Sequence, residues 1–248
     1  DYDQSTGDAL YSVTAVYEDG TESAKVSIST PVESQGADNK VITFSGGGFS
    51  IPDVFASSYS KCTIEFLIKP TKFSNYDCMA GPGWGTWHQH CDANGNYYCG
   101  SNTGSDRITS SSAMTLAWQH MAIVVNGNKL TLFKNGTSVG TLTSSNFSGI
   151  GGFGEYVFTN GGNGQFAKYD EIRIWSTTRT ATELKGGNSG KVEYTGDMLP
   201  AELLAYYKGD PFQGEDGNTY LRDCVGGHHA RLLDDNYAEE IDNSLVLK

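Results

Sequence analysis

Apolar and polar residues alternate along much of the chain, which is the pattern of β-strands with one buried face. Ile64, Phe66 and Ile68 fall on one face of such a run. Cys62 is in step with them, which predicts a small core residue. Residues 165–175 form another run, and few segments keep a helical period for more than two turns. The pattern therefore predicts an all-β chain.

Turn and cap signals divide these strands. Asn-Gly dipeptides at 126–127 and 135–136 separate three alternating stretches, which predicts an antiparallel meander with two tight turns. Thr180 and Glu183 have the spacing of a helix-capping box, and Gly186 with its glycine neighbour would end the helix early. One short helix is thus expected in an otherwise β protein.

The N-terminal stretch alternates most cleanly. Tyr11 and Val13 share one face before an Asp19-Gly20 turn, and a second alternating run follows, which predicts a hairpin. Residues 1–32 resemble the last hairpin of a fibronectin type III domain, a sandwich of about 100 residues. We therefore expect the tail of an upstream module of a longer parent chain, with residues 33–248 as one domain. Because a lone hairpin is barely stable, we expect it to pack on that domain or on another chain.

Charge narrows the range of partners. The chain has 17 basic and 29 acidic residues, a net charge of −12. Such a surface repels phosphate groups, so nucleic acid and anionic membrane surfaces are poor partners. No apolar run approaches the roughly 20 residues that a membrane-spanning helix needs, so we expect no membrane insertion.

Five stretches carry a family pattern when they are taken in order. They are residues 41–53, 62–70, 117–141, 169–184 and 203–232. The third contains Trp-x-His and Phe-x-Asn-Gly, and the fourth contains Asp-Glu-Ile-Arg-Ile. Together they resemble the laminin-G-like, concanavalin A-like jelly-roll modules of secreted and cell-surface bacterial proteins, which are relatives of the pentraxins. The resemblance implies an all-β antiparallel two-sheet jelly-roll sandwich with one short helix.

The resemblance also implies a function. It is that of a non-catalytic carbohydrate-binding or cell-adhesion module of a secreted or cell-surface protein, with a glycan or glycoprotein as partner. A structural spacer domain of a larger surface protein is the alternative. Laminarinase-type glycoside hydrolases share the fold, but they carry two catalytic carboxylates in a Glu-x-Asp-x-Glu motif or a close variant of it. The nearest match here is Glu240 and Asp242 followed by Ser244, so we expect no enzyme.

The segment from 76 to 100 is unusually rich in Cys, Trp and His for this family. Its rings Trp84, Trp87, Tyr97 and Tyr98 are flat and amphipathic, and sugars stack on such rings while polar groups bind their hydroxyls. With His88 they are the predicted carbohydrate-binding residues, and we expect at least two of the four rings to be accessible to solvent. The competing interpretation is that half of them fill the core.

Two other uses of this segment stay open. His88 and His90 share one face of an extended strand, and zinc could be bound by histidine and cysteine, although no Cys-x-x-Cys spacing is present. Cys78, Cys91 and Cys99 could instead form one disulfide. A two-residue turn would put Cys91 and Cys99 on opposite faces of the hairpin, and a bulged three-residue loop would put them on the same face.

Adjacent carboxylates raise the question of an acid/base pair. If Ile172 and Ile174 face the core, alternation puts Asp170 on their side and Glu171 with Arg173 on the other side. Glu171 and Arg173 are then expected to form a solvated ion pair of little energetic weight. The two carboxylates diverge, so we do not expect them to act on one substrate.

An inward-pointing Asp170 needs a partner. Either backbone N–H groups cap it, or it binds Ca²⁺, which accepts carboxylates and backbone carbonyls. The resemblance favours calcium, because many concanavalin A-like jelly rolls hold a structural calcium ion with the Asp that opens this strand. The Gly-rich loop Ser45–Gly48 is the expected source of the carbonyl ligands.

Overall fold

The computed structural model describes residues 8–13, 26–31, 40–75, 77–82, 87–101, 106–158, 164–187, 199–225 and 227–245. The chain divides into two compact units, residues 1–38 and residues 39–248. Each unit is treated by itself below.

The first unit contains a two-stranded antiparallel ladder. Strand β1 (Asp8–Val13) pairs with β2 (Val26–Pro31), so that Tyr11 lies opposite Ile28. The pairing is the one expected of the predicted hairpin. The Asp19-Gly20 turn lies outside the described residues, and the likeness to a fibronectin type III module stays a prediction.

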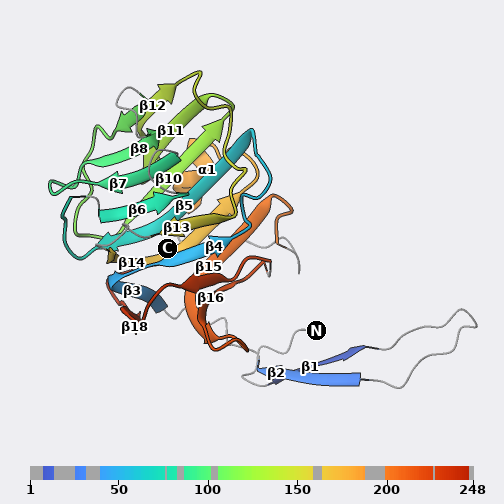
Figure 1. Cartoon of the computed structure of the whole chain (residues 1–248). Helices are drawn as coiled ribbons and strands as arrows, with labels where there is room; N and C mark the ends of the chain where they lie inside the picture. The colour runs from blue at the N-terminus through green and yellow to red at the C-terminus, as the bar shows by residue number, and fades with distance from the viewer. Residues whose placement is uncertain are drawn as a thin grey trace, which may run out of the picture. The chain divides into compact units, whose positions relative to one another are not determined.

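The second unit is almost entirely β-structure (Figure 1). Its strands are β3 (Lys40–Gly47), β4 (Phe49–Pro52), β5 (Lys61–Pro70), β6 (Asp77–Gly81), β7 (Trp87–Cys91), β8 (Tyr97–Ser101), β9 (Arg107–Thr109), β10 (Gln119–Asn126), β11 (Lys129–Lys134), β12 (Thr137–Thr143), β13 (Glu155–Phe158), β14 (Gln165–Trp175), β15 (Leu203–Gln213), β16 (Thr219–Asp223), β17 (Ala230–Leu232) and β18 (Tyr237–Ile241). The short helix α1 (Ala181–Gly187) follows β14. No helix in the described part of the chain is long and apolar enough to cross a lipid bilayer.

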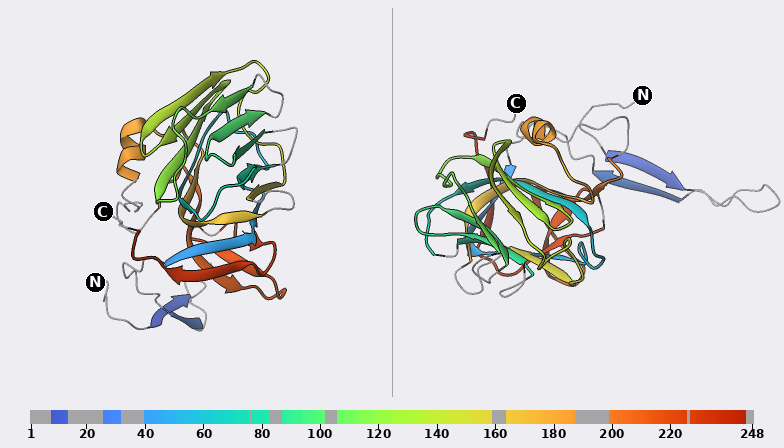
Figure 2. Two further views of the ribbon diagram at one scale, coloured as in Figure 1. Left: turned by 90° about the vertical axis from the view of Figure 1, so that its left-hand side faces the viewer. Right: turned by 90° about the horizontal axis from the view of Figure 1, so that it is seen from above.

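The strands form one antiparallel ladder that folds over into two layers. Its order is β12-β11-β10-β5-β14-β15-β16-β17-β4-β13-β6-β7-β8-β9, and β3 joins β14 and β18 beside this path. The layer with β10, β5 and β14 faces the layer with β4, β13 and β6 to β9, and α1 lies outside the first layer (Figure 2). This arrangement confirms the predicted two-sheet jelly-roll sandwich with one short helix.

An aromatic core joins the two layers. Phe49 of β4 and Phe158 of β13 stack with ring centroids 4.4 Å apart. Tyr169 of β14 meets these two rings edge-on, at 6.1 and 5.9 Å. Cys62 is fully buried in the same core, as predicted. Removing one such ring would leave a cavity and cost about 3–5 kcal/mol of the free energy of unfolding.

One of the two predicted Asn-Gly turns forms as expected. Asn135 and Gly136 form a two-residue turn with φ of 50° and 72°, the left-handed values that an Asn-Gly turn requires. The other turn lies one residue further on than predicted, because Asn126 still pairs with Lys129 and the loop residues are Gly127-Asn128.

The capping box also forms as predicted. The N–H of Thr180 donates to a Glu183 carboxylate oxygen at 2.6 Å, and the N–H of Glu183 donates to the Thr180 hydroxyl at 3.3 Å. Helix α1 then packs Leu184 on Ala122 and Val124 of β10, on the outer side of that layer.

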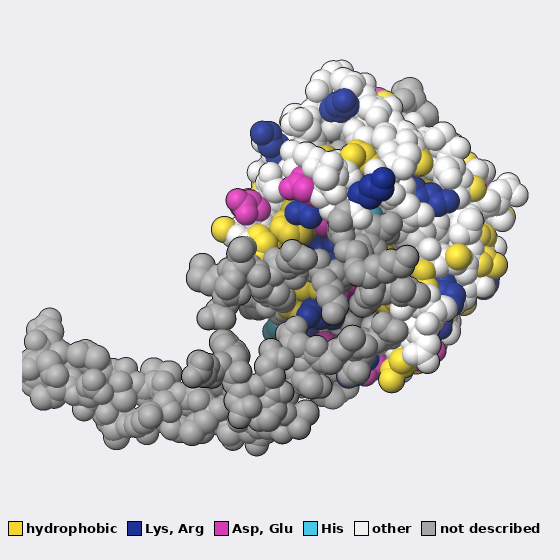
Figure 3. Space-filling model, turned by 180° about the vertical axis from the view of Figure 1, so that it is seen from behind, with side chains coloured by type: hydrophobic (Ala, Val, Ile, Leu, Met, Phe, Trp, Pro, Cys, Tyr) yellow, Lys and Arg dark blue, Asp and Glu magenta, His cyan; other side chains and the backbone are white. Residues whose placement is uncertain are grey.

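Basic side chains are dispersed on the face of the molecule seen from behind. Figure 3 shows the described Lys and Arg side chains there as separate spots among neutral ones.

Candidate functional site

A β-bulge in β14 sets the direction of the two adjacent carboxylates. Asp170 pairs with Leu67 of β5, whereas Arg173 pairs with Glu65, so β14 carries one extra residue in between. Glu171 is the extra residue, and its φ of 52° lies in the left-handed region.

The bulge overturns the predicted direction of Asp170. Tyr169 and Ile172 both belong to the main core between the layers, so strict alternation fails at this point. Asp170 lies opposite Leu67, which packs with Val41 in a separate cluster outside that core. The prediction that Asp170 shares the core face of Ile172 is therefore wrong, because one inserted residue resets the alternation.

The expected solvated pair of Glu171 and Arg173 is also wrong. The two residues are 5% and 1% exposed, and the Arg173 guanidinium donates to the Glu171 carboxylate. The Tyr206 hydroxyl donates to the same carboxylate at 2.6 Å. The pair is buried because Trp175 and Tyr206 form an apolar cluster over this part of the sheet. Removing one partner of such a pair would leave a buried charge uncompensated.

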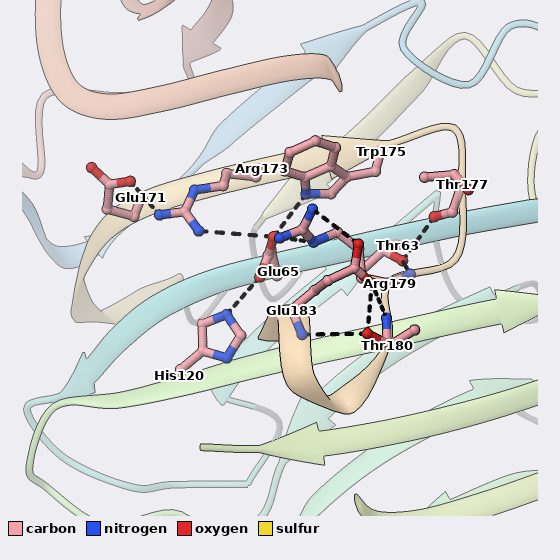
Figure 4. A network of polar contacts seen from close by, with 10 residues as sticks. All are labelled: Thr63, Glu65, His120, Glu171, Arg173, Trp175, Thr177, Arg179, Thr180 and Glu183. Atoms are coloured by element: carbon pink, nitrogen blue, oxygen red, sulfur yellow. Dashed lines mark hydrogen bonds and ion pairs between the residues drawn. The ribbon is translucent and has the colours of Figure 1, made fainter. Parts of the chain in front are cut away.

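Glu65 is the centre of this buried network, and sequence reasoning missed it (Figure 4). Its carboxylate accepts a hydrogen bond from Trp175 Nε1 at 2.7 Å and lies 2.8 Å from His120 Nε2. Guanidinium nitrogens of Arg173 and Arg179 lie 3.8 and 3.6 Å away. A glutamate between Thr63 and Phe66 in an apolar strand was the available signal, since a buried charge needs partners.

The neighbours of Glu65 determine its protonation. Burial alone would raise the pKa of this carboxyl, but the hydrogen bond with His120 and the positive charge of Arg173 outweigh burial and lower the pKa to about 2. The network also reaches α1, since Arg179 lies 3.9 Å from Glu183. The network ties three strands and a helix together, and its carboxylates Glu65 and Glu171 are buried, so these two residues serve the architecture.

Asp170 has a backbone partner. Its Oδ1 accepts a hydrogen bond from the N–H of Glu171, the next residue in the chain, at 2.8 Å. Burial and the neighbouring charge of Glu171 raise the pKa of Asp170 well above its usual range.

The calcium ligands expected from Ser45–Gly48 do not reach Asp170. Gly47 lies opposite Gln165, five residues before Asp170, which is about 16 Å at 3.3 Å per residue. A calcium–oxygen contact is about 2.3–2.6 Å, so that part of the predicted set is wrong. In the described ranges no group of three or more His, Cys, Asp or Glu side chains is arranged to hold a metal, and this includes His88 with His90. Asp170 as a calcium ligand stays a prediction.

The loop of the β7–β8 hairpin is longer than the two-residue turn and the three-residue loop that the sequence left open. Cys91 pairs with Tyr97 and Gln89 pairs with Cys99, which leaves 92–96 as the loop. The four paired residues are all fully buried, so Cys91 and Cys99 share the core face. The Tyr97 hydroxyl donates to Gln89 at 2.5 Å. Tyr97 is thus a core residue and offers no ring to a sugar, contrary to its predicted role.

The opposite face of the hairpin carries His88, His90 and Tyr98. His88 and His90 are 2% and 4% exposed and their rings stack 5.2 Å apart. His88 therefore has almost no surface with which to contact a glycan, which corrects its predicted role. Burial, with the positive charges of His88 and Arg107, lowers the pKa of His90 to about 4, so its ring is neutral at pH 7.

Tyr98 is half-buried, and its ring is flanked on both sides. Its ring lies between that of His90, 5.0 Å away, and the guanidinium of Arg107, 4.5 Å from the ring centroid. Its hydroxyl donates to Asp92 at 3.0 Å. Tyr98 can therefore offer an edge and polar neighbours, rather than an open face.

The two tryptophans decide whether a stacking surface exists. Trp84 lies outside the described residues, and the side chain of Trp87, in β7, is likewise not described. The prediction that rings of this segment stack on a sugar thus stays a prediction, and it now depends on Trp84 and Trp87.

The Glu240 and Asp242 motif lacks the electrostatics of a hydrolase. Glu240 forms an ion pair with Lys168, which lowers the pKa of its carboxyl. Asp242 lies 3.1 Å from Lys69 and 3.0 Å from Lys168. Burial alone would raise the pKa of Asp242, but its hydrogen bonds lower it. A glycosidase needs one carboxyl with a raised pKa as its general acid, and neither residue meets that need.

Comparisons with known proteins agree with the fold. The sequence profile of the concanavalin A-like lectin/glucanases superfamily matches residues 43–185. A candidate carbohydrate-binding protein from Bacteroides ovatus superposes with a TM-score of 0.66 at 17% identity, over 88% of this chain and 68% of that one. The SAP-like pentraxin of Limulus polyphemus superposes with a TM-score of 0.53 at 14% identity, over 84% and 96%. No curated protein sequence matches the chain.

Proposed function

Because the chain belongs to the concanavalin A-like lectin/glucanases superfamily, we propose that it is a non-catalytic carbohydrate-binding module. The proposal includes a secreted or cell-surface location, with a glycan or glycoprotein as partner. The superfamily name joins sugar binders and sugar-cleaving enzymes, so the choice depends on the carboxylates and on the surface of this chain.

The carboxylates argue for binding rather than cleavage. Glu65 and Glu171 are buried and held by Arg173, so no substrate can reach them. Glu240 is partly exposed and Asp242 is buried, and both are paired with Lys168. Retaining and inverting hydrolysis both require two carboxyl groups on either side of an open cleft, with separated pKa values.

The observation that carries the proposal is the outer face of the β7–β8 hairpin. There Tyr98, Arg107 and Asp92 bring a ring edge, a guanidinium and a carboxylate together at the surface. Sugar hydroxyls are bound by such polar groups, and sugar C–H faces by aromatic rings. We propose Trp84, in the same segment, as a stacking ring of this site. Trp87 begins β7 two residues before Gln89, so we propose it as a second stacking ring at the end of the hairpin and not on the face of Tyr98.

A glycan array with the whole chain tests the proposal. Specific hits are expected, and Trp84→Ala and Trp87→Ala should each weaken the best hit by at least about tenfold while thermal unfolding is unchanged, since stacking on one ring is worth roughly 1–2 kcal/mol. Trp118→Ala is the matched control, because that ring packs on Val41 and Leu67 outside the hairpin. Uniform silence on the array would favour a structural spacer. Reducing sugar released from any β-glucan would favour a hydrolase.

A further inference from the structure

A second group of rings and arginines lies on β15, β16 and β17. Tyr220 of β16 pairs with Phe212 of β15 on one side and with Arg231 of β17 on the other. The two rings stack with centroids 5.8 Å apart. The guanidinium of Arg222 lies over Phe212, 4.8 Å from the ring centroid. These four residues, Phe212, Tyr220, Arg222 and Arg231, are called the β16 patch below.

The arginines of the β16 patch are available to a ligand. Arg222 and Arg231 are exposed, and the two rings are half-buried. No carboxylate of a described residue forms an ion pair with either arginine, whereas Arg173 and Arg179 do have such partners. Arg222 and Arg231 are diagonal neighbours on one face of an antiparallel pair, about 7–8 Å apart at the backbone. Two guanidinium groups at that spacing can both reach one carboxylate.

The rings of the β16 patch are held without the arginines. The Tyr220 hydroxyl donates to Asp216 at 2.6 Å, and the side-chain amide of Asn218 donates to the same carboxylate at 2.7 Å. His229 meets Phe212 edge-on at 5.0 Å, and its Nδ1 accepts the N–H of Asp223 at 3.1 Å. The ring pair is therefore fixed before any ligand arrives, which lowers the entropy cost of binding.

We propose that the β16 patch is a second binding surface, for a pyranose that carries a carboxylate. The ring pair suits the C–H face of the sugar, and the guanidinium fork suits a carboxylate through two parallel hydrogen bonds. A neutral sugar would leave both guanidinium groups without a partner. The inference rests on the proposed sugar-binding function but uses other residues.

The two surfaces are well separated. In the strand order, β16 and β8 are separated by β17, β4, β13, β6 and β7, which is about 29 Å along the sheet at 4.8 Å per strand (Figure 1). The net charge of −12 does not prevent binding of an acidic sugar, because repulsion is screened beyond about 8 Å at physiological salt. Contacts with the two arginines act within that distance.

Calorimetry with the whole chain tests the inference. The probes are trigalacturonic acid and the methyl glycoside of N-acetylneuraminic acid, each beside its methyl ester, which keeps the ring and removes the charge. At least one acid should bind about tenfold or more tightly than its ester. Arg222→Gln and Arg231→Gln should each weaken acid binding by about tenfold and leave thermal unfolding unchanged, since both side chains are exposed.

Two controls locate the effect. Lys129→Gln removes one positive charge from β11, which β10, β5, β14 and β15 separate from β16 in the strand order, and should leave acid binding unchanged. Tyr220→Phe keeps the ring and should retain most of the binding, whereas Tyr220→Ala should lose it.

The failure of this inference differs from the failure of the proposed function. Equal binding of acid and ester, or acid binding that survives both arginine variants, overturns the inference. If the array yields neutral glycans while neither acid binds, the β16 patch is not a sugar site and the module remains a carbohydrate binder. If no sugar binds at all, both proposals are wrong.

Discussion

At the scale of single residues, the charge of Glu65 is kept by neighbouring side chains rather than by water. The carboxylate has 0% exposed surface and lies beside His120, Trp175 and Arg173. Its pKa is lowered from 4.5 to about 2. A folded-state pKa below the unfolded value means that the ionised form stabilises the fold above pH 4.5, and that this contribution is lost as the pH falls toward 2.

Glu65→Gln should therefore remove a pH-dependent part of the stability. At pH 6 the variant should unfold more easily than the parent chain, by about 3 kcal/mol for a shift of this size, and the two should converge near pH 2. Urea unfolding between pH 6 and pH 2 measures the difference. Asp170, with its raised pKa, acts with the opposite sign in both proteins and so cancels in the comparison. A gap that does not change with pH would contradict the assignment.

Asp170 gives a second prediction at this scale. If it binds structural calcium, a chelator should lower the melting temperature of the parent chain and leave Asp170→Ala unaffected. Scanning calorimetry with and without chelator measures both. Asp170→Asn is the companion variant, because its side-chain oxygen can still accept the N–H of Glu171. Identical melting of the parent chain in the two buffers would leave Asp170 as a backbone cap only.

Glu171 is the residue at which the predicted side-chain directions of β14 fail. Alternation predicts direction only while the period of two holds, and a bulge breaks the period without a required residue type. A left-handed glycine would have signalled it, whereas a glutamate at φ 52° gives no such sign. The left-handed backbone of Glu171 costs about 1–2 kcal/mol. The hydrogen bonds of its carboxylate with Arg173 and Tyr206 offset this strain.

At the scale of elements, the length of one loop decides which rings of the β7–β8 hairpin face outward. Asp92 accepts the N–H groups of Asn94 and Asn96 at 2.8 and 3.0 Å, which stabilises a loop of residues 92–96 instead of a two-residue turn. The resulting register buries Tyr97 with Gln89. The Asn-Gly pair at 94–95 reads as a tight turn in the sequence, so the buried ring was not predictable from it.

Gly95 tests this loop. Its φ is +76°, and an added Cβ would lie 2.8 Å from the backbone oxygen of Met114, which cannot move aside easily. Gly127 has φ of +59° and an added Cβ there would meet nothing within 4 Å. Gly95→Ala should therefore lower the free energy of unfolding by about 2–4 kcal/mol, against about 1 kcal/mol for Gly127→Ala. Urea unfolding of the two variants measures both, and equal losses would mean that the close approach to Met114 does not constrain the loop.

Elements with purely local signals were predictable. The turn at Asn135 and the cap at Thr180 depend on neighbours within four residues, so the sequence carries all the information that they need. The hairpin loop and the bulge depend on strands that arrive from elsewhere in the chain. Local patterns cannot report those partners.

At the scale of the whole molecule, the sandwich is closed by contacts between distant segments. Leu232 of β17 pairs with Phe49 of β4, and Tyr237 of β18 pairs with Phe44 of β3. No periodicity in the sequence specifies such pairs. The order of the five family stretches indicates such pairs instead, because each stretch occupies a fixed strand of the jelly roll. The profile match over residues 43–185 agrees with this order. The binding surface could not be predicted in the same way, since a fold is shared by many functions.

The N-terminal hairpin carries the last prediction. In its ladder Tyr11 lies opposite Ile28 and Val13 opposite Val26, a register that aligns apolar residues along both strands. A two-stranded ladder is marginally stable in water without an apolar surface to cover it. We predict that it packs on the jelly roll or on another chain, and that the protease Glu-C therefore cleaves slowly after Glu33.

The exposed loop between β15 and β16 supplies the internal reference for this experiment. Glu215 lies in that loop and is exposed, so cleavage after it reports the rate for an accessible site in the same molecule. If the hairpin packs, cleavage after Glu33 should be slower than after Glu215.

The product that lacks residues 1–33 should then melt at a lower temperature than the intact chain, because covered apolar surface becomes exposed. Concentration dependence separates the two kinds of packing, since contacts between chains weaken on dilution whereas contacts within a chain do not. Rapid cleavage after Glu33, with the same melting temperature afterwards, would contradict the prediction and leave residues 1–33 as an independent leader.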